Sequence, residues 1–173
     1  NINDHIIYNA ELSSADASAM LQQFDITTSG SYQTTDLKST PFKLWYKNSD
    51  DFSTAVQIGS SQASTTGNGE TISFTSLGSA ILDGTTAYLW VTADIRCDAV
   101  VGRTISVTGA DNVDFTFPLV DFVTTGTYSV GGTQTVIANS LVSDVTSLAA
   151  TEDGSSSVIT WINPLRCYDD VMI

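Results

Sequence analysis

The amino-acid sequence predicts an all-β protein, an antiparallel β-sandwich of two sheets followed by the first strands of a second β-sandwich. Short segments in which apolar and polar residues alternate recur along the chain, separated by turn residues at intervals of about eight to twelve positions. Ser, Thr and Gly are abundant and only 14% of the residues are charged, a composition that disfavours long helices. No helical pattern alternates with the strands, which argues against a parallel α/β fold.

The densest run of aromatic and branched side chains, residues 88–95, predicts a central strand. Its odd-numbered side chains form an aliphatic face, whereas Tyr88, Trp90 and Thr92 share the other face, because side chains alternate along a strand. A strand that is apolar on both faces is typical of the interior of a covered sheet. The residues expected to be nearly fully buried are Leu89, Val91 and Ile95, with Phe42, Leu44, Phe74 and Ile105 against them.

The N-terminal region predicts one strand and an ambiguous segment. Residues 5–12 alternate, with Ile6, Tyr8, Ala10 and Leu12 on one side. Residues 13–19 are expected to form a loop or an irregular edge. A helix over residues 14–23 is the alternative, favoured by Ala and Met, although it would be short and without a repeated apolar face.

Residues 42–47 predict a second strong strand, with Phe42, Leu44 and Tyr46 facing inward. The opposite face carries Trp45 between Lys43 and Lys47, and two lysines indicate that this face is exposed to solvent. We expect this face to be an interaction surface, where Trp45 stacks on a sugar or packs on a neighbouring module. Residues 60–69 lack an apolar anchor and are expected to form a mobile loop. Further strands are expected at residues 21–28, 56–58, 70–77, 103–108, 113–117 and 126–136.

A domain boundary is expected near residue 140, which divides the chain into residues 1–140 and 141–173. Residues 145–151 and 157–164 resemble the first two strands of a fibronectin type III domain, with Trp161 as the core tryptophan. Residues 167–173 would then begin the third strand. So short a segment cannot offset its ordering entropy of ~1.5 kcal/mol per residue. We therefore expect the chain to be a piece of a longer protein.

Several segments within residues 5–136 carry distinctive motifs, namely residues 24–32, 36–37, 42–46, 52–55, 84–95 and 99–105. Together they resemble a repeat found in very large secreted and cell-surface proteins of the Bacteroidetes. The repeat is similar to the N-terminal module associated with some sialidases of these bacteria. The resemblance implies an extracellular or outer-membrane location, export by the type IX pathway, and a role as a spacer, stalk or adhesive surface.

The charge balance limits the classes of partner. The formal net charge is −13, from 19 acidic and 6 basic residues, so nucleic acid is a poor partner because its binding rests on Lys and Arg. An acidic surface keeps exported proteins soluble, or it serves as a dedicated surface for cations or minerals. No apolar run approaches the ~20 residues that span a bilayer, so the chain is not expected to cross a membrane.

The sequence offers no catalytic constellation, and we expect no catalytic residues and no bound cofactor. His5 is the only histidine, so no Ser-His-Asp triad can be drawn around it from nearby residues. Glu11, Glu70 and Glu152 lie on different predicted elements, which does not support the paired carboxylates of a glycosidase.

Two weaker sites are suggested by residue type. Loop carboxylates at Asp50 with Asp51, and at Asp111 with Asp114, could gather oxygen ligands for calcium, although neither pair follows the EF-hand pattern. Cys97 and Cys167 are either separate thiols or one disulfide, which in an oxidising location would clamp the main module to the start of the next. Their spacing does not match a zinc site.

These observations predict a non-enzymatic structural or adhesive module of a large extracellular bacterial protein. We expect it to be part of a homo-oligomeric fibre or appendage, with a glycan or another cell-surface ligand as partner. The alternative is an accessory carbohydrate-binding or spacer module of a secreted hydrolase.

Overall fold

In the computed structural model, the described residues are 3–13, 18–77, 81–83, 86–108, 114–117, 132–137, 146–154 and 156–162. The chain divides into two compact units, unit 1 (Asn1–Val136) and unit 2 (Ile137–Ile173). In the part of the chain that the structure describes, every helix is a short 3-10 turn, and none is long and apolar enough to cross a membrane. The chain is all-β, as the sequence predicts.

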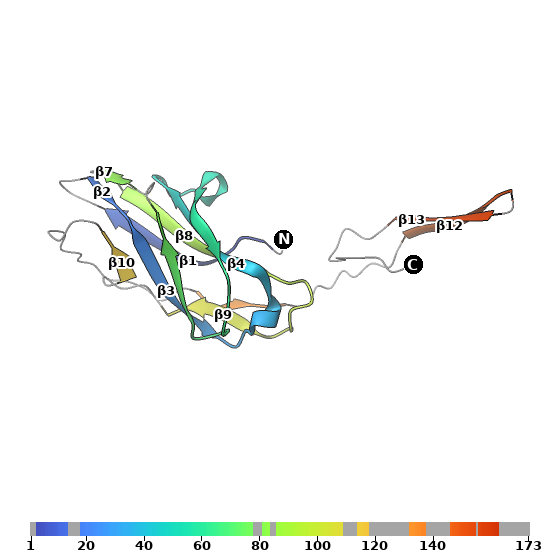
Figure 1. Cartoon of the computed structure of the whole chain (residues 1–173), viewed down its shortest axis with the longest axis horizontal. Helices are drawn as coiled ribbons and strands as arrows, with labels where there is room; N and C mark the ends of the chain where they lie inside the picture. Colours follow the sequence, from blue (N-terminus) through green and yellow to red (C-terminus); the bar gives the residue numbers. More distant parts are fainter. Residues whose placement is uncertain are drawn as a thin grey trace. The chain divides into compact units, whose positions relative to one another are not determined.

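Unit 1 is a sandwich of two antiparallel sheets (Figure 1). The first sheet has the order β1 (His5–Ser13), β8 (Thr86–Ile95), β4 (Leu37–Lys47) and β5 (Val56–Gln62). The second has the order β10 (Phe115–Thr116), β3 (Gln23–Gly30), β9 (Thr104–Val107) and β11 (Gln134–Thr135), with β6 (Thr71–Thr75) also paired to β3. A small separate pair joins β2 (Ser18–Met20) to β7 (Ile81–Asp83). Two 3-10 turns, η1 (Thr34–Asp36) and η2 (Phe52–Thr54), flank β4.

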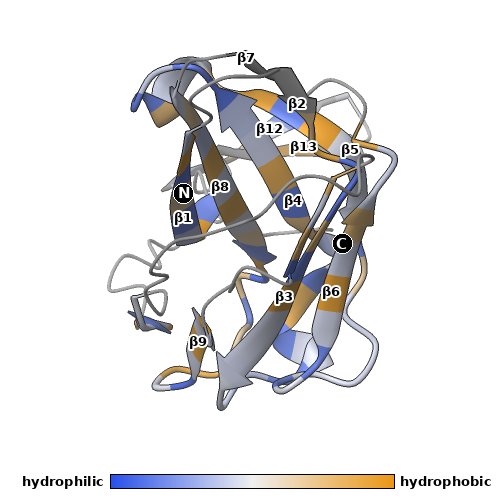
Figure 2. Cartoon of the chain, turned by 90° about the vertical axis from the view of Figure 1, so that its left-hand side faces the viewer, coloured by the Kyte–Doolittle hydropathy of each residue, from blue (hydrophilic) through white to orange (hydrophobic). Residues whose placement is uncertain are grey.

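The core lies between the two sheets, and hydrophobic and hydrophilic residues follow one another along the strands that enclose it (Figure 2). The predicted burial of Leu89 and Val91 is confirmed, since both are at most 1% exposed. The four residues expected against them, Phe42, Leu44, Phe74 and Ile105, are also buried. Ile95 is only partly buried, because it is the last residue of β8 and packs at the margin of the core.

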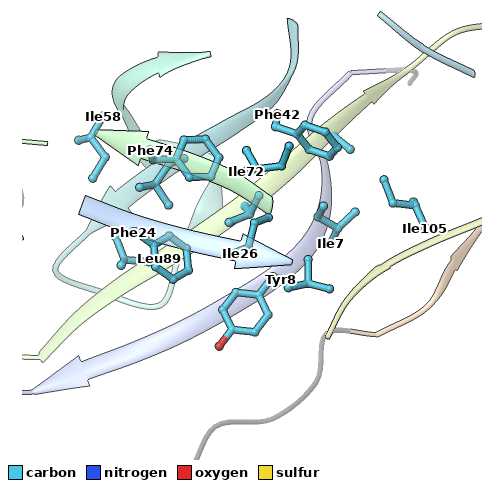
Figure 3. Packing of buried hydrophobic residues seen from close by; sticks show 14 of the residues in the cluster. Ile7, Tyr8, Phe24, Ile26, Phe42, Ile58, Ile72, Phe74, Leu89 and Ile105 are labelled. Carbon is cyan, nitrogen blue, oxygen red and sulfur yellow. The ribbon is translucent and has the colours of Figure 1, made fainter. Parts of the chain in front are cut away.

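Phe24 on β3 is the centre of an aromatic cluster inside the core (Figure 3). Its ring centroid lies 4.7 Å from that of Phe115, and 6.3 Å from those of Tyr8 and Phe74. Such separations are typical of favourable aromatic pairs, each worth about 0.5–1.5 kcal/mol beyond the burial of area. Residues from β1, β3, β6 and β10 therefore meet at one point and join the two sheets.

The predicted alternation of β1 is wrong at its start. The register with β8 shifts between Ile6 and Tyr8, and both Ile7 and Tyr8 are buried, whereas Ile6 is exposed. A β-bulge inserts one residue and reverses the side-chain phase at that point. The residue that enters the core is therefore Ile7, while Tyr8 onward keep the predicted phase.

Two other local predictions are corrected by the sheets. Ser18–Met20 is a strand paired to β7, so the helical alternative is wrong for these residues, while residues 14–17 lie outside the described part. The strand expected at residues 56–58 continues to Gln62. Of the segment 126–136, the structure describes only residues 132–136, in which β11 is the strand.

Gly30 ends β3 at a point of close approach between two backbones. Its φ is +121°, and a Cβ atom built there would lie 2.3 Å from the carbonyl oxygen of Thr104. Only glycine tolerates both the backbone conformation and the missing space. The close approach brings Ser31 next to Thr104, whose carbonyl oxygen accepts from the backbone N–H of Ser31 at 2.9 Å.

In unit 2 the structure describes an antiparallel hairpin of β12 (Thr146–Asp153) and β13 (Ser156–Ile162). Both strands lie where the sequence predicts them. Residues 163–173 lie outside the described part, so the third strand expected from residue 167 and the resemblance to a fibronectin type III domain stay predictions.

Candidate interaction surface

The outer face of the first sheet carries an aromatic cluster, defined here as Trp45, Phe52, Tyr88 and Trp90. Trp45 on β4 lies directly opposite Trp90 on β8. Phe52 of η2 packs against both, with ring centroids 5.6 Å from Trp45 and 5.8 Å from Trp90, and Tyr88 stacks on Trp90 at 6.1 Å. Trp90 is only 3% exposed although it points away from the core. The cluster is thus a second, smaller apolar centre that fastens η2 to the sheet.

Trp45, the predicted contact residue, is half-buried, and its polar atom is already bound. Its indole Nε1 donates to Thr92 Oγ1 at 2.9 Å. A buried indole N–H without an acceptor would cost stability, and Thr92 supplies that acceptor from within the protein. A sugar or a neighbouring module would therefore meet only the remaining exposed part of the ring.

Lys43 is held between two carboxylates rather than free in solvent. Its Nζ lies 2.8 Å from Asp4 Oδ1 and 2.9 Å from Asp94 Oδ2, and Asp94 Oδ1 accepts from the backbone N–H of Asp4 at 2.8 Å. Burial alone would lower the pKa of Lys43, but the bonds to Asp4 and Asp94 outweigh it and raise the pKa. We call Asp4, Lys43 and Asp94 the Lys43 cluster.

Lys47, at the other end of β4, is paired with Asp51 at 2.8 Å and also donates to Thr54. Asp51 in turn caps η2, since its Oδ1 accepts from the backbone N–H of Ser53 at 3.1 Å. The Lys47 ammonium, together with the Ser53 and Thr54 donors, holds the pKa of Asp51 well below its usual range. A calcium ion at this predicted site would have to displace the ammonium of Lys47.

The other predicted ligands are less well defined by the structure. Asp50 is exposed, Asp114 is half-buried, and Asp111 lies outside the described residues. Within the described ranges, no three His, Cys, Asp or Glu side chains are gathered closely enough to hold a metal ion. Cys97 is exposed, and Cys167 lies outside the described residues, so the disulfide stays a prediction.

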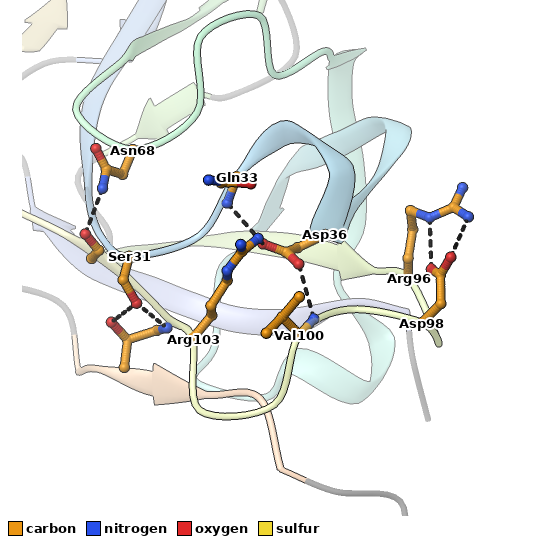
Figure 4. Close-up of polar contacts among 10 residues, drawn as sticks. Ser31, Gln33, Asp36, Asn68, Arg96, Asp98, Val100 and Arg103 are labelled. Atoms are coloured by element: carbon orange, nitrogen blue, oxygen red, sulfur yellow. Dashed lines mark hydrogen bonds and ion pairs between the residues drawn. The ribbon is translucent and has the colours of Figure 1, made fainter.

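A buried carboxylate that sequence reasoning missed, Asp36, ties together three segments at one end of unit 1 (Figure 4). It is 2% exposed, and its Oδ2 lies 2.6 Å from Arg103 Nη1 and 2.8 Å from the backbone N of Gln33. Its Oδ1 accepts from the backbone N–H of Val100 at 3.0 Å. Burial would raise the pKa of Asp36, but the bonds from Val100, Arg103 and Gln33 outweigh it and lower the pKa.

A second missed carboxylate, Glu70, anchors the loop that was expected to be mobile. Its Oε2 accepts from the backbone N–H groups of Thr65 at 2.7 Å and Thr66 at 3.1 Å, and Ser64 donates to Oε1. The Tyr32 hydroxyl lies 3.1 Å from the same Oε1. Burial would raise the pKa of Glu70, but these donors outweigh it and lower the pKa.

The contacts around Glu70 also change the titration of the Tyr32 hydroxyl. Burial and the charge of Glu70 together raise the pKa of Tyr32 well above its ordinary value of 10.0, against a smaller opposing bond with Thr28. Residues 64–70 are therefore fastened by polar contacts. The loop predicted at residues 60–69 is wrong for residues 60–62, which belong to β5, while its mobility stays a prediction.

A phase argument could have found two of these carboxylates. Glu70 shares the alternation of Ile72 and Phe74, which face the core, and Asp94 shares the phase of Trp90 and Thr92. Asp36 lies three residues after Gln33, a spacing that resembles a capping box. For Glu70 and Asp94 the residue type suggested a solvent-exposed position, whereas the position in the strand pattern indicated burial. The spacing of Asp36 from Gln33 indicates a helix cap and not burial.

Among the described residues, Asp36, Glu70 and Asp94 thus bind donors within unit 1 through both carboxylate oxygens, whereas Asp25 Oδ1 is buried without a hydrogen-bond partner. Of the sequence-predicted surface residues, the structure brings Trp45 to Trp90 and Phe52. It places Lys43 between Asp4 and Asp94, and it pairs Lys47 with Asp51. His5 is exposed at the start of β1.

No known family model matches the sequence, and neither a curated protein nor a solved structure is significantly similar to it.

Proposed function

We propose that this chain is a non-catalytic structural and adhesive module of a large extracellular bacterial surface protein. One observation carries the proposal most directly. The buried carboxylates of unit 1, Asp36, Glu70 and Asp94, are each bound through both oxygens to donors that hold loops or strand ends. A catalytic acid or base needs a proton site turned toward a substrate, whereas these groups are oriented toward backbone N–H groups and cations.

Location and partners follow from charge and resemblance. A net charge of −13 suits a protein kept soluble outside the cell. The resemblance to repeats of Bacteroidetes surface proteins supports an extracellular or outer-membrane location and export by the type IX pathway. A homo-oligomeric fibre would then give attachment strength through many weak, identical contacts to a glycan or another cell-surface ligand.

Retention of chain-coated beads on surfaces tests the adhesive role. Beads carrying the 173-residue chain should be retained on glycan-coated, protein-coated or chain-coated surfaces more than beads carrying albumin. Chain-coated surfaces also report self-association, which sedimentation of the free chain should confirm as an oligomer. Retention equal to that of albumin on all three surfaces, with a monomer in sedimentation, contradicts the proposal.

A second candidate is an accessory carbohydrate-binding module of a secreted hydrolase. It is favoured by the half-buried rings of Trp45 and Tyr88, which lie on one sheet face as stacking surfaces for a sugar. Glycan-array binding that is lost in Trp45→Ala but kept in Trp45→Phe supports this candidate. Array binding that both variants keep contradicts a sugar site at Trp45. A wild-type chain that binds no glycan on the array contradicts the carbohydrate-binding candidate.

A further inference from the structure

Among the strands that the structure describes, those nearest to where the chain enters and leaves unit 1 are both edge strands. In that part of the chain, β1 is the outer strand of the first sheet and β11 is the outer strand of the second. An edge strand has neighbours on one side only, so it can separate without first disrupting another strand. The two strands belong to different sheets, and among the described strands they do not pair with each other.

The start of β1 and the end of β11 also lie at the same end of the sandwich. The backbone N–H of Asp4 donates to Asp94, near the end of β8. Two residues further along the chain, the backbone N–H of Arg96 donates to the carbonyl oxygen of Asp36 at 2.8 Å. Asp36 is bonded to Arg103, and the carbonyl oxygen of Arg103 accepts from Val136 N at 2.8 Å. A short series of hydrogen bonds thus connects the residues just before β1 with the residue just after β11 (Figure 4 shows its middle part).

This arrangement decides how tension along the chain would act. The hydrogen bonds between antiparallel strands run perpendicular to the strands. When the force acts between the first residue of β1 and the residue just after β11, both at one end of the sandwich, the pairs of β1 with β8 open one after another. The order runs from His5–Ala93 to Ser13–Thr86. If the sheet were instead held at its far end, all these pairs would share the force and would have to fail together.

The Lys43 cluster holds the first ion pairs that tension on β1 meets in the described part of the chain, after an exposed hydrogen bond from Lys38 Nζ to Asn3 Oδ1 at 2.6 Å. Asp4 precedes β1, and it is bound to Lys43 of β4 and to Asp94 of β8, so it joins the incoming chain to both inner strands of the sheet. The side chains of Lys43 and Asp94 are 19% and 9% exposed, which limits screening by salt, whereas that of Asp4, which carries the load from β1, is 32% exposed. Hydrogen bonds with charged partners are stronger than the neutral ladder bonds that follow.

We propose that unit 1 is a module that extends under low tension, in which β1 peels from the sheet edge and the Lys43 cluster sets the force at which peeling begins. The inference rests on the proposed role in a surface protein that experiences tension. It differs from a rigid spacer, because the core between the sheets is not sheared when both chain ends leave from one end. The unit would lengthen first and unfold its core later.

Single-molecule force spectroscopy on the whole chain tests the geometry. One handle is attached at the N-terminus and the other at residue 137 or residue 48, through Ile137→Cys or Asn48→Cys in a Cys97→Ser, Cys167→Ser background. Asn48 follows β4 at the opposite end of the sheet from Asp4, so this second pair loads β1 along its length. The first opening should need a force at least about twofold lower for the 137 handle, because bonds then fail singly. Equal or higher force with the 137 handle overturns the proposal.

A pair of matched lysine variants tests the latch. Lys43→Met should lower the force at which β1 is released, identified by its extension of about 3.3–3.6 Å per freed residue. Lys47→Met removes an ion pair from the other end of the same strand and should leave that force unchanged. Equal effects of the two variants overturn the latch. The bead-retention result does not enter this measurement, so a failed adhesive role and a failed latch are distinguishable.

Discussion

The two faces of β8 are both buried, but different kinds of neighbour cover them. The inner face, with Leu89, Val91 and Ala93, lies in the core against the second sheet. The outer face, with Trp90, Thr92 and Asp94, is covered by no second sheet among the described strands, yet these residues are at most 6% exposed. There the cover consists of individual side chains, such as Phe52 over Trp90.

The difference teaches that burial alone does not define a core. Many apolar residues from several strands cover the inner face, so a loss there leaves a cavity that rigid neighbours cannot fill. The outer face is covered by one aromatic turn and by polar bonds, and the segments held by Asp36 and Glu70 are likewise fastened by polar bonds. Substitutions at these places should therefore lower the free energy of unfolding less than substitutions in the core, and they should change only the local structure. Where a carboxylate is involved, the loss should depend on pH.

The largest expected effect is at the inner face. Leu89→Ala should lower the free energy of unfolding by about 4 kcal/mol, because Leu89 is 1% exposed and packed between the sheets. Chemical denaturation followed by Trp fluorescence measures this loss. A loss below about 1 kcal/mol would mean that the inner face is no more critical than an exposed position.

The outer tryptophan should be somewhat less critical. Trp90→Ala should lower the free energy of unfolding by about 3 kcal/mol, the lower part of the range for a buried Trp, since Phe52 and Tyr88 can collapse into part of the space. Near-ultraviolet circular dichroism of the folded variant should change while the far-ultraviolet spectrum stays the same. A cost larger than that of Leu89→Ala would contradict the proposed difference between the two faces.

The polar contacts of Glu70 should make the free energy of unfolding depend on pH. Glu70→Gln should cost about 2 kcal/mol at pH 7, because Gln loses the charge that strengthens the bonds from Thr65 and Thr66. The folded-state pKa of Glu70 lies below its ordinary value of 4.5, so its contribution is complete above that pH and is lost as pH falls through the folded-state pKa.

Denaturation curves from pH 7 down to about pH 3 measure this linkage for wild type and variant. The gap in stability between the two should narrow as the pH falls below 4.5. Leu89→Ala is the matched control, since it removes no titratable group and its cost should stay nearly constant over this range. A gap that stays constant for Glu70→Gln as well would show that the carboxylate charge does not fasten the loop.

The smallest expected effect concerns the indole nitrogen of Trp45. Trp45→Phe keeps an aromatic ring beside Phe52 but removes the donor to Thr92, which should cost about 1 kcal/mol. The double variant Trp45→Phe, Thr92→Val should recover part of that loss, because both polar partners are then gone. Costs that simply add in the double variant would show that the two groups do not interact.

The sequence by itself determined the all-β class, the central strand and its aliphatic face. Leu89 and Val91 were predicted correctly because alternation is a property of the strand itself, set by the direction of successive Cβ atoms. The inward positions of Phe42, Leu44 and Phe74 follow from the same local period. Lys43, Trp45 and Lys47 share one phase on β4 for the same reason, while the role of this face as an interaction surface stays a prediction.

Only the tertiary structure decided which polar groups are buried and what covers the outer face. Asp36 and Arg103 are 67 positions apart, and Asp94 and Asp4 are 90 apart, so no local pattern relates them. The bulge at Ile7 likewise depends on how β1 pairs with β8. A short-range pattern shows which side chains point the same way, but the partner that satisfies a buried charge is supplied by segments that meet only when the chain folds.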